Sequence, residues 1–342
     1  MKKYRNGLIV GKFAPLHKGH ELLIEYGLRE CEKLFIFSYS KPEFAGYEPP
    51  RREHWLKLRF PNAEIFVFKA EDVQKRFGFD LPANDANDVT HRRFVGRLWL
   101  ELVNEPLDVV FTSENYGDGF AAELTEYFAE RADFPIVNHV CVDLERLQIP
   151  ISGSQMRGDV HGLKHFLASE IYASFVKRIC FLGGESSGKS TLAEAAANEY
   201  KTIFVAEYGR TLWEEQSGNL TFEDLLKIAR RHIQNEDAAA AQADKFLFVD
   251  TSPLTTLFYS LQLFGAADPE LVRLSYREYD CVFLCAPDFP FVQDGTRVGA
   301  EFRNLQHRWY LETLGERQIS FEILSGDLTA RLLQIKNSLK GF

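Results

Sequence analysis

The sequence predicts an α/β protein built from two doubly wound parallel-sheet domains, one following the other. Short apolar runs rich in Val, Ile and Phe alternate with longer helical patterns, which is typical of parallel strands joined by crossover helices. The 342 residues exceed the roughly 100 to 200 expected for one domain. A glycine-containing turn also follows the first run in each half of the chain.

The apolar runs divide into two sets of five expected strands. The first set covers residues 8–13, 34–39, 65–68, 109–112 and 136–142. The second set covers residues 179–182, 203–206, 246–249, 282–285 and 321–324. Between the sets, residues 158–176 are expected to form a helix that leads directly into a new strand. We therefore expect domains at residues 1–175 and 176–342, with a further helix over residues 222–243.

The composition is that of a globular protein with small-molecule partners. The formal net charge of −9 leaves no general basic surface for a phosphate backbone, so we expect no nucleic-acid partner. The N-terminal apolar stretch is interrupted too early for a signal peptide, and no segment reaches the ~18 apolar residues of a membrane span. We expect a cytoplasmic protein with no membrane contact and with reduced cysteines. Whether the chain forms a homo-oligomer is left open by the sequence.

The first chemical motif is an H-x-G-H at the turn that follows the first strand, where doubly wound sheets bind ligands. Two imidazoles three residues apart share a helix face, and a glycine between them lets a phosphate approach the helix N-terminus. The alternative is that both histidines only cap the helix. The candidate residues of this turn are Gly11, Lys12, Phe13, His17, Gly19 and His20.

A second motif, I-S-G-S-Q-M-R, spans residues 151–157 at the other end of the same expected domain. The hydroxyls of Ser152 and Ser154 would contact phosphate oxygens, and Arg157 would offer a planar pair of donors to a triphosphate. Helix capping by the two serines is the alternative. Either motif alone only suggests a phosphate-binding site, whereas the two motifs in one expected domain are specific evidence for such a site.

Together the two motifs resemble those of the nucleotidylyltransferase superfamily. This resemblance implies that an acceptor phosphate attacks the α-phosphorus of ATP directly, so that the protein supplies alignment and charge stabilisation. It implies catalytic roles for His17, His20 and Arg157, assisted by Lys12 and Ser154. Class I aminoacyl-tRNA synthetases also carry H-x-G-H, but K-M-S-K-S is absent and the acidic charge suits tRNA poorly.

The third motif is a complete G-x-x-x-x-G-K-[ST] between an expected strand and helix, the context that a P-loop requires. Backbone N–H groups of this loop would surround the β-phosphate. Lys189 would bridge the β- and γ-phosphates, and the Ser190 hydroxyl would bind Mg²⁺. The residues of the motif are Gly183, Gly184, Glu185, Ser186, Ser187, Gly188, Lys189, Ser190 and Thr191.

Later strands supply further candidates for the same phosphoryl-transfer site. Asp250 ends the run at residues 246–249 and would serve as a Walker-B-like carboxylate, either in direct contact with Mg²⁺ or behind the groups that bind it. Glu207 follows another strand and would orient or deprotonate an acceptor hydroxyl, with Tyr208 and Arg210 beside it. A solvated acid at a strand end is the alternative for Glu207.

A lid is expected between residues 288 and 308. Arg297 and Arg303 are the candidates for closing over the transferred phosphoryl group and excluding water. Solvated helix arginines are the alternative, and Arg308 could take the role of Arg303.

An H-x-G-H domain followed by a P-loop domain resembles the bacterial bifunctional nicotinamide-nucleotide adenylyltransferase/ribosylnicotinamide kinase family. The segments around Ser113 and Tyr116 and around Glu207 and Arg210 match as well. The resemblance implies a Rossmann-like nucleotidylyltransferase domain followed by a P-loop kinase domain. The kinase would convert nicotinamide riboside and ATP to nicotinamide mononucleotide (NMN), and the first domain would adenylylate NMN to NAD with release of pyrophosphate.

The chain departs from the family pattern in two places. Ser252 stands where the family has an aspartate, and the first strand begins close to Met1, whereas enteric members carry an N-terminal helix-turn-helix domain. We therefore do not expect this chain to control transcription. Two other functions stay open: the same chemistry on different acceptors, and a nucleotide sensor without turnover.

Two aromatic residues and one pair of histidines are weaker candidates for binding a ligand or a metal. Trp99 or Tyr116 could stack on a pyridine ring, although core packing is the usual role of such residues. His161 and His165 have a spacing that could hold zinc on a helix, but no third ligand is nearby and an ordinary helix face is favoured.

Overall fold

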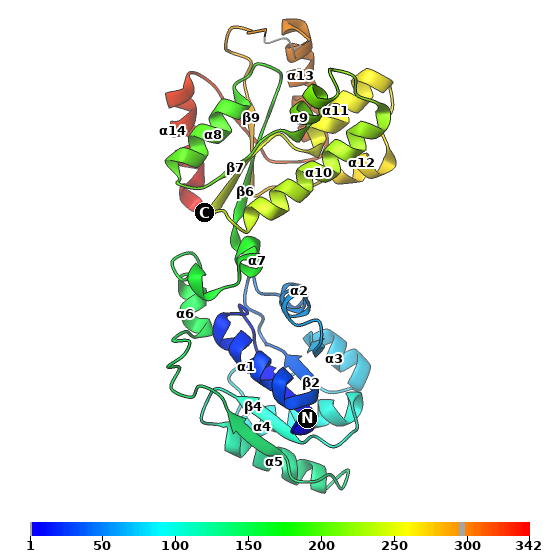
Figure 1. Ribbon diagram of the computed structural model, residues 1–342, viewed down its shortest axis with the longest axis vertical. Coiled ribbons are helices and arrows are strands. Elements are labelled where there is room, and N and C mark those ends of the chain that lie inside the picture. Colours follow the sequence, from blue (N-terminus) through cyan, green and yellow to red (C-terminus); the bar gives the residue numbers. More distant parts are fainter. Residues whose placement is uncertain (1, 294–297) are drawn as a thin grey trace. The chain divides into compact units, whose positions relative to one another are not determined.

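The computed structural model describes residues 2–293 and 298–342 (Figure 1). The chain divides into two compact units, Met1–Ile171 and Tyr172–Phe342. Sequence patterning places this division near residue 175, within the short 3-10 helix η2 (Ala173–Phe175) that leads into the second unit. None of the helices in the described ranges is long and apolar enough to cross a membrane.

The first unit holds a five-stranded parallel sheet in the order β3-β2-β1-β4-β5. Because the strand order reverses at β1, the loops that follow β1 and β4 open a crevice at the carboxyl edge of the sheet. Its elements are β1 (Tyr4–Gly11), α1 (Lys18–Glu30), β2 (Cys31–Ser38), α2 (Pro49–Arg59), β3 (Glu64–Val67), α3 (Ala70–Phe77), α4 (Asp88–Leu102), β4 (Val109–Thr112), α5 (Gly117–Ala129), β5 (Asn138–Cys141) and α6 (Gly153–Gly158).

Aromatic residues fill one face of this sheet. Phe35 and Phe37 point from β2 onto Trp99 of α4, which is fully buried. The indole Nε1 of Trp99 donates to the carbonyl oxygen of Glu105 at 2.7 Å. Trp99 is therefore a core residue and cannot stack on a ligand.

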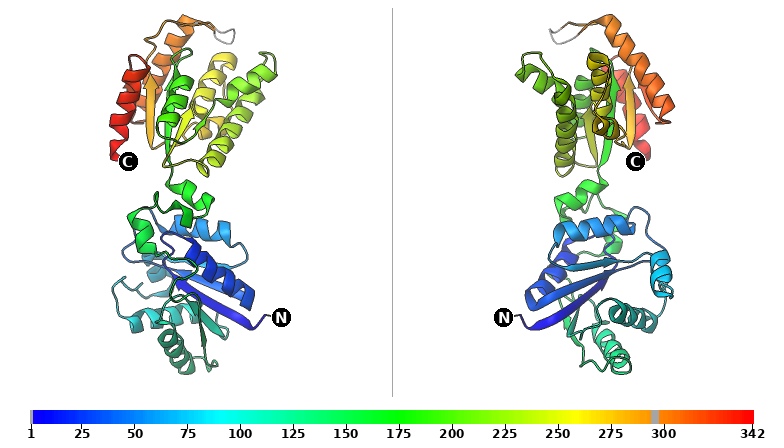
Figure 2. Two further views of the ribbon diagram at one scale, coloured as in Figure 1. Left: turned by 60° about the vertical axis from the view of Figure 1, so that its left-hand side comes forward. Right: turned by 90° about the vertical axis from the view of Figure 1, so that its right-hand side faces the viewer.

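The second unit holds another five-stranded parallel sheet, in the order β10-β9-β6-β8-β7. Its central strand β6 has helices on both sides in the views of Figure 2. Its elements are β6 (Lys177–Gly183), α8 (Lys189–Glu199), β7 (Phe204–Val205), α9 (Tyr208–Glu215), α10 (Phe222–Ala240), β8 (Phe246–Asp250), α11 (Pro253–Phe264), α12 (Pro269–Leu274), β9 (Cys281–Cys285), α13 (Ala300–Glu316), β10 (Glu322–Leu324), α14 (Leu328–Ser338) and η3 (Leu339–Gly341).

Residues that alternate along β6 belong to two separate cores. Ile179 and Phe181 pack with alanines of α8, whereas Cys180 and Leu182 pack with leucines of α10, α11 and α13. A strand covered on both faces must be apolar throughout, because successive side chains point to opposite sides. This explains the continuous run I-C-F-L directly before the P-loop motif.

The predicted fold class is confirmed, and each of the ten expected strands is present; β4 has the predicted ends, and the others are shifted at one or both ends. Strand β1 ends at Gly11 rather than at Phe13, which has a φ of 49° and begins the turn. The expected helix over residues 158–176 is wrong. Asp159 Oδ1 accepts from the Gly162 N–H at 2.8 Å, and this local turn replaces a helix. The segment continues as η1 (Lys164–Phe166) and α7 (Ser169–Tyr172), so His161 and His165 share no helix face.

Candidate active sites

The first cavity, of about 490 Å³, lies at the carboxyl edge of the first sheet. Residues of both sequence motifs line it, together with residues of the loop that follows β4. Of the residues expected from sequence, the cavity is lined by Gly11, Lys12, Phe13, His20, Ser113, Tyr116, Ser152, Ser154 and Arg157. Tyr116 is 40% exposed and is the aromatic residue here that could stack on a ligand.

His17 and His20 form a stacked pair at the N-terminus of α1. Their ring centroids are 3.7 Å apart, and each Nδ1 accepts a hydrogen bond from the other residue's backbone N–H, at 3.4 and 3.5 Å. This capping arrangement assigns the ring proton of each histidine to Nε2. One nitrogen of each ring thus caps the helix and the other is left to donate. His20 lines the cavity, whereas His17 does not, and its buried Nε2 has no hydrogen-bond partner among the described residues.

Burial keeps both rings neutral. Burial, with a smaller contribution from Arg146, lowers the pKa of His17 to about 4. Burial and the neighbouring His17 hold the pKa of His20 well below its ordinary value. Gly19 permits this packing, since a Cβ there would lie 3.1 Å from the His17 ring. The histidines can therefore act as neutral hydrogen-bond donors at pH 7.

Arg157 joins the second motif to the first. Its Nη1 donates to the Ala14 carbonyl oxygen at 2.7 Å and its Nη2 to Ser154 Oγ at 3.2 Å. Its guanidinium lies 4.1 Å from the centroid of Phe44, which the Lys12 ammonium also approaches at 5.6 Å. Burial, followed by Arg157, lowers the pKa of Lys12. The two cations face the cavity from one side.

The two serines of this motif have different surroundings. Ser152 Oγ is the N-cap of α6: it accepts from the Gln155 N–H at 3.3 Å and contacts Gln155 Oε1 at 2.8 Å. Ser154 Oγ accepts from Arg157 Nη2, and the residue lines the cavity. Ser154 is therefore the better placed of the two to contact a ligand.

Sequence reasoning missed polar residues that reach this cavity from other segments. Tyr39 and His91 form a hydrogen bond of 3.0 Å at its edge. Arg146 enters from the loop after β5 and donates to Glu114 at 3.1 Å. No short motif surrounds these residues, so only the tertiary fold identifies them. The further polar lining residues are Asn84, Asp88, Arg92 and Thr112.

The second cavity, of about 470 Å³, lies at the carboxyl edge of the second sheet, where β6 turns into α8. The P-loop forms one wall, and α9 and α11 form the opposite wall. The residues expected from sequence that line it are Glu185, Ser186, Ser187, Gly188, Lys189, Ser190, Thr191, Glu207, Tyr208 and Arg210.

Gly183 and Gly184 serve the loop's packing and do not line the cavity. Gly183 has a φ of 146°, and a Cβ on Gly184 would lie 2.6 Å from the Arg303 carbonyl oxygen. The loop then turns into α8 at Gly188, whose φ is 82°. Lys189 Nζ lies back over the loop and donates to the Gly184 carbonyl oxygen at 3.0 Å.

A buried arginine supports the P-loop from the far end of the unit. Arg331 of α14 is 1% exposed and donates to the carbonyl oxygens of Ser187 at 2.8 Å and Ala286 at 3.0 Å. It also pairs with Asp288. Sequence analysis did not single out Arg331, because its partners are distant in sequence and no motif surrounds it.

Three carboxylates surround the phosphate-binding loop. Asp250 ends β8 and is buried, and its Oδ1 has no hydrogen-bond partner among the described residues. Burial and then the Asp250 charge raise the pKa of Glu207 to about 6, against the opposing effect of Lys189. Glu185 accepts from the Tyr259 hydroxyl at 3.0 Å and from the Val298 N–H at 2.9 Å.

The orphaned oxygen of Asp250 fits a divalent cation. Carboxylate and hydroxyl oxygens are the ligands that Mg²⁺ uses beside nucleotide phosphates, and Ser190 lines the same cavity. Asp250 itself does not line the cavity, so it stands behind the P-loop surface. No cluster of three or more His, Cys, Asp or Glu suited to a metal occurs within the described ranges.

The two expected lid arginines have different outcomes. Arg297 lies outside the described residues. Arg303 is buried and its Nη1 donates to the Phe289 carbonyl oxygen at 2.8 Å, so it braces the loop before α13 and does not line the cavity. Gln306 and Tyr310, one and two turns later on the same face of α13, are buried as well, so Arg303 lies on the inward face of the helix.

Comparisons with known proteins find related sequences for nearly the whole chain. It is 30% identical to the trifunctional NAD biosynthesis/regulator protein NadR of Escherichia coli (strain K12), over 96% of this chain and 81% of that protein. It is also 30% identical to the protein of the same name from Salmonella typhimurium, over 98% and 82% of the two chains. A family model described as "AAA domain" matches residues 178–331.

Two solved structures share the fold over the whole chain. A crystal structure of NadR protein in complex with NR has a TM-score of 0.69 at 20% identity, and covers 100% of this chain and 97% of that one. A crystal structure of NadR protein in complex with NAD and AMP-PNP has a TM-score of 0.68 at 19% identity, with coverages of 100% and 98%.

Proposed function

Because the chain belongs to the NadR family of NAD biosynthesis and regulator proteins, we propose that it is an enzyme with two ATP-dependent activities. The second domain phosphorylates nicotinamide riboside to NMN. The first domain transfers an adenylyl group from ATP to NMN, producing NAD and pyrophosphate. The product of one cavity is thus the substrate of the other.

The observation that carries this proposal is the presence of two separate phosphate-binding turns, each after the central strand of its own sheet. One turn contains two neutral histidines and Arg157, and the other contains a complete P-loop. Related proteins bind NR in one structure and NAD with an ATP analogue in another. Ligands of both reactions therefore occur in the family.

In the first cavity the protein would work without a side-chain nucleophile. A phosphate oxygen of NMN attacks the α-phosphorus of ATP, and the bond from that phosphorus to the bridging oxygen of pyrophosphate breaks. The charge on the departing pyrophosphate grows during this step. The Nε2–H groups of His17 and His20 and the guanidinium of Arg157 would stabilise it, because preorganised donors act most strongly where charge develops.

In the second cavity Glu207 is the candidate general base. Its pKa of about 6 makes it ionised at pH 7 yet basic enough to accept a proton from the attacking riboside hydroxyl. That hydroxyl oxygen bonds to the γ-phosphorus of ATP as the bond to the β-phosphate oxygen breaks. Lys189 and the loop N–H groups would hold the β- and γ-phosphates in line. Ser190 would hold Mg²⁺, with the buried Asp250 carboxylate behind it, and the ion neutralises phosphate charge when bound.

The proposal is tested by incubating the chain with ATP, Mg²⁺ and single acceptors, and recording product masses. The panel contains nicotinamide riboside, its acid form, uridine, thymidine, NMN and nicotinic acid mononucleotide. We expect NMN from nicotinamide riboside, and NAD with pyrophosphate from NMN. Faster turnover of another acceptor would replace the assigned substrate. Absence of product with every acceptor would favour a nucleotide sensor and contradict the proposal.

A further inference from the structure

Phe44 lies behind the two cations of the first cavity, outside the groups that the proposed chemistry uses. The guanidinium carbon of Arg157 is 4.1 Å from the centroid of its ring, and the ammonium nitrogen of Lys12 is 5.6 Å from the same point. Lys12 and Arg157 line the cavity, whereas Phe44 does not. One aromatic ring therefore contacts both cations from behind the cavity surface.

These two cations converge without a carboxylate partner among the described residues. The Arg157 guanidinium donates to the Ala14 carbonyl oxygen and to Ser154 Oγ, and both acceptors are neutral. Burial and then the Arg157 charge lower the pKa of Lys12, and no carboxylate counters this shift. Two like charges thus approach one another with only the ring of Phe44 to offset their repulsion.

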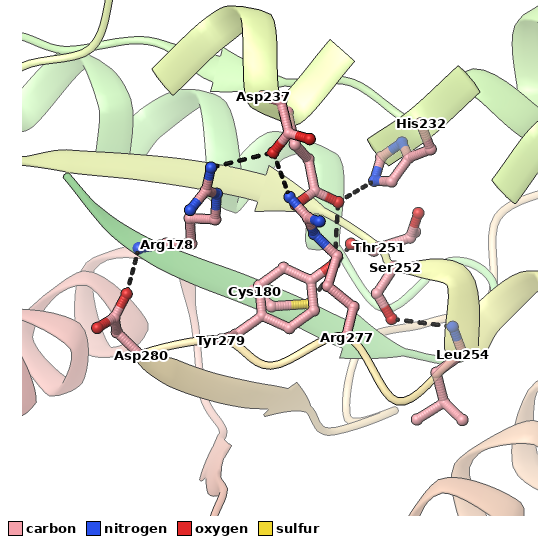
Figure 3. Close-up of polar contacts among 11 residues, drawn as sticks. Arg178, Cys180, His232, Asp237, Thr251, Ser252, Leu254, Arg277, Tyr279 and Asp280 are labelled. Atoms are coloured by element: carbon pink, nitrogen blue, oxygen red, sulfur yellow. Dashed lines mark hydrogen bonds and ion pairs between the residues drawn. The ribbon is translucent and has the colours of Figure 1, made fainter. Parts of the chain in front are cut away.

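Arginines of the second domain that lie outside its cavity have a different kind of partner (Figure 3). Arg277 donates to Glu236 at 2.8 Å and to Asp237 at 2.6 Å. Asp237 also accepts from Arg178 at 3.1 Å. Such carboxylates fix an arginine in place, but they would compete with phosphate oxygens for the same donors. A cation that must bind phosphate therefore benefits from a partner of another chemistry.

An aromatic face can hold a cation without neutralising it. The π electrons give the face of the ring a negative potential, which attracts an ammonium or guanidinium group within about 6 Å of the centroid. The ring has no formal charge and no hydrogen-bond acceptor of the kind that a carboxylate offers. It therefore leaves the charge of Lys12 and the remaining donors of Arg157 to a phosphate.

The loop that carries Phe44 is anchored on both sides of the ring. Before it, Glu43 accepts from Nη1 and Nη2 of Arg52 at 2.7 and 3.1 Å, and Arg52 is 0% exposed. After it, the Tyr47 N–H donates to the Phe44 carbonyl oxygen at 2.9 Å. A two-bond contact between arginine and carboxylate fixes orientation as well as distance. The ring is thus held in place independently of the two cations.

We propose that Phe44 is a positioning residue for adenylyl transfer: the face of its ring holds Lys12 and Arg157 together in the wall of the first cavity and leaves their charges to the triphosphate. This inference rests on the proposed adenylyltransferase function and adds a residue to it. Phe44 acts through the two cations and does not contact the substrate.

The first test compares Phe44→Leu with a series in which the Phe44 ring carries one, two or three fluorine atoms. Fluorine weakens the negative potential of the ring face and changes its shape little. The attraction of a half-buried cation to a ring corresponds to about 3- to 10-fold in a rate or equilibrium constant. We expect kcat/KM of adenylyl transfer to NMN to fall by this factor in Phe44→Leu, and by a growing part of it along the series. A fluorinated series that stays at the wild-type rate would overturn the proposal.

Phe79 supplies a matched control in the same domain. The Arg97 guanidinium carbon lies 3.9 Å from the centroid of the Phe79 ring, but neither residue lines the first cavity. Phe79→Leu and fluorinated Phe79 should leave adenylyl transfer nearly unchanged. A loss at Phe79 as large as the loss at Phe44 would show a general effect on the domain and would contradict the role of Phe44.

Two further variants test why the partner is uncharged. Phe44→Gln and Phe44→Glu introduce side chains of nearly the same shape, but only the glutamate can form an ion pair with Lys12 or Arg157. We expect KM for ATP in adenylyl transfer to be several-fold higher in the Glu variant than in the Gln variant, because the carboxylate competes with the triphosphate. An equal or lower KM in the Glu variant would refute this reason for the aromatic ring.

A third measurement separates this proposal from the assigned activity. The fluorine NMR resonance of singly fluorinated Phe44 is recorded without nucleotide, alone and combined with Arg157→Ala or Lys12→Ala. We expect the resonance to move in both variants, and to move further in Arg157→Ala because that cation is nearer to the ring. An unchanged resonance in Arg157→Ala would refute the contact and the proposal with it. Failure of wild type to adenylylate any acceptor would refute only the assigned activity.

Discussion

Arg157 and Ala14 are joined by a hydrogen bond of 2.7 Å, although 143 residues separate them in sequence. The bond links the helix of the second motif to the turn that precedes the first motif. It therefore orients the Arg157 guanidinium relative to the histidine pair on α1. A lysine could not make this bond and the one to Ser154 in the same way, because it lacks the rigid planar donors of arginine.

Replacement of His20 by alanine should slow adenylyl transfer much more than it weakens ATP binding. The His20 ring faces charge that grows only as pyrophosphate departs, so its effect belongs to the transition state. Loss of one such donor commonly costs about 10²- to 10³-fold in kcat, or roughly 3 to 4 kcal/mol. Steady-state kinetics of both reactions test this, with circular dichroism to confirm folding. A large rise in KM at unchanged kcat would show that His20 binds only ground-state ATP.

Replacement of Lys189 by alanine should abolish phosphorylation of nicotinamide riboside and leave adenylylation of NMN nearly unchanged. The reason is that each domain has its own phosphate-binding turn and its own hydrophobic core. Both reactions are measured by product mass on the same preparation. Lys201→Ala, an exposed lysine after α8, serves as the control. Parallel loss of both activities in a folded Lys189 variant would contradict the two-site assignment.

The pH dependence of the two reactions should differ. The Glu207 pKa is raised to about 6, so below this pH the carboxyl is protonated and cannot accept a proton. We expect kcat/KM of phosphorylation to fall about tenfold per pH unit below that value. Glu207→Gln should lower the rate about 10²- to 10⁴-fold and remove this inflection.

Adenylyl transfer should show no inflection near pH 6.5. The histidines that serve it have pKa values well below the ordinary value of about 6.5, so they stay neutral from pH 6 to 8. Initial rates in buffers of constant ionic strength test both expectations. An inflection near 6.5 that disappears in the His17→Ala or His20→Ala variant would show that one ring titrates there.

Arg331→Met should destabilise the second domain and lower its kinase activity. The substitution keeps much of the side-chain volume but leaves Asp288 without its partner and three carbonyl oxygens without their donor. Because Asp288 is 35% exposed, we expect a cost below the roughly 3 to 5 kcal/mol that breaking a fully buried ion pair commonly has. Pulse proteolysis in urea, with mass spectrometry to identify the cleaved domain, measures this. Arg308→Met, at an exposed arginine of α13, should change stability little.

The sequence predicts those parts of the molecule whose structure depends on residues that are close together in the chain. Buried parallel strands are apolar runs, and the H-x-G-H and P-loop turns need glycines and donors within ten residues of each other, so both are visible in the chain. His232 lines the second cavity, Arg331 supports the P-loop, and Phe44 packs against Arg157, but each comes from a distant segment and nothing beside it in sequence marks it. Arg303 shows the reverse case: its neighbours suggested an exposed lid, and tertiary packing buried it.

The bond between Arg331 and Ser187 spans 144 residues and has a consequence for how the chain acquires its activities. During synthesis, both sequence motifs of the first domain have been translated once Arg157 is made. The P-loop, in contrast, lacks the hydrogen bond from Arg331 until α14 has left the ribosome. At about 5 to 20 residues per second, the interval is on the order of ten seconds or more. If the proposed function holds, a nascent chain would complete the adenylylation site before the phosphorylation site.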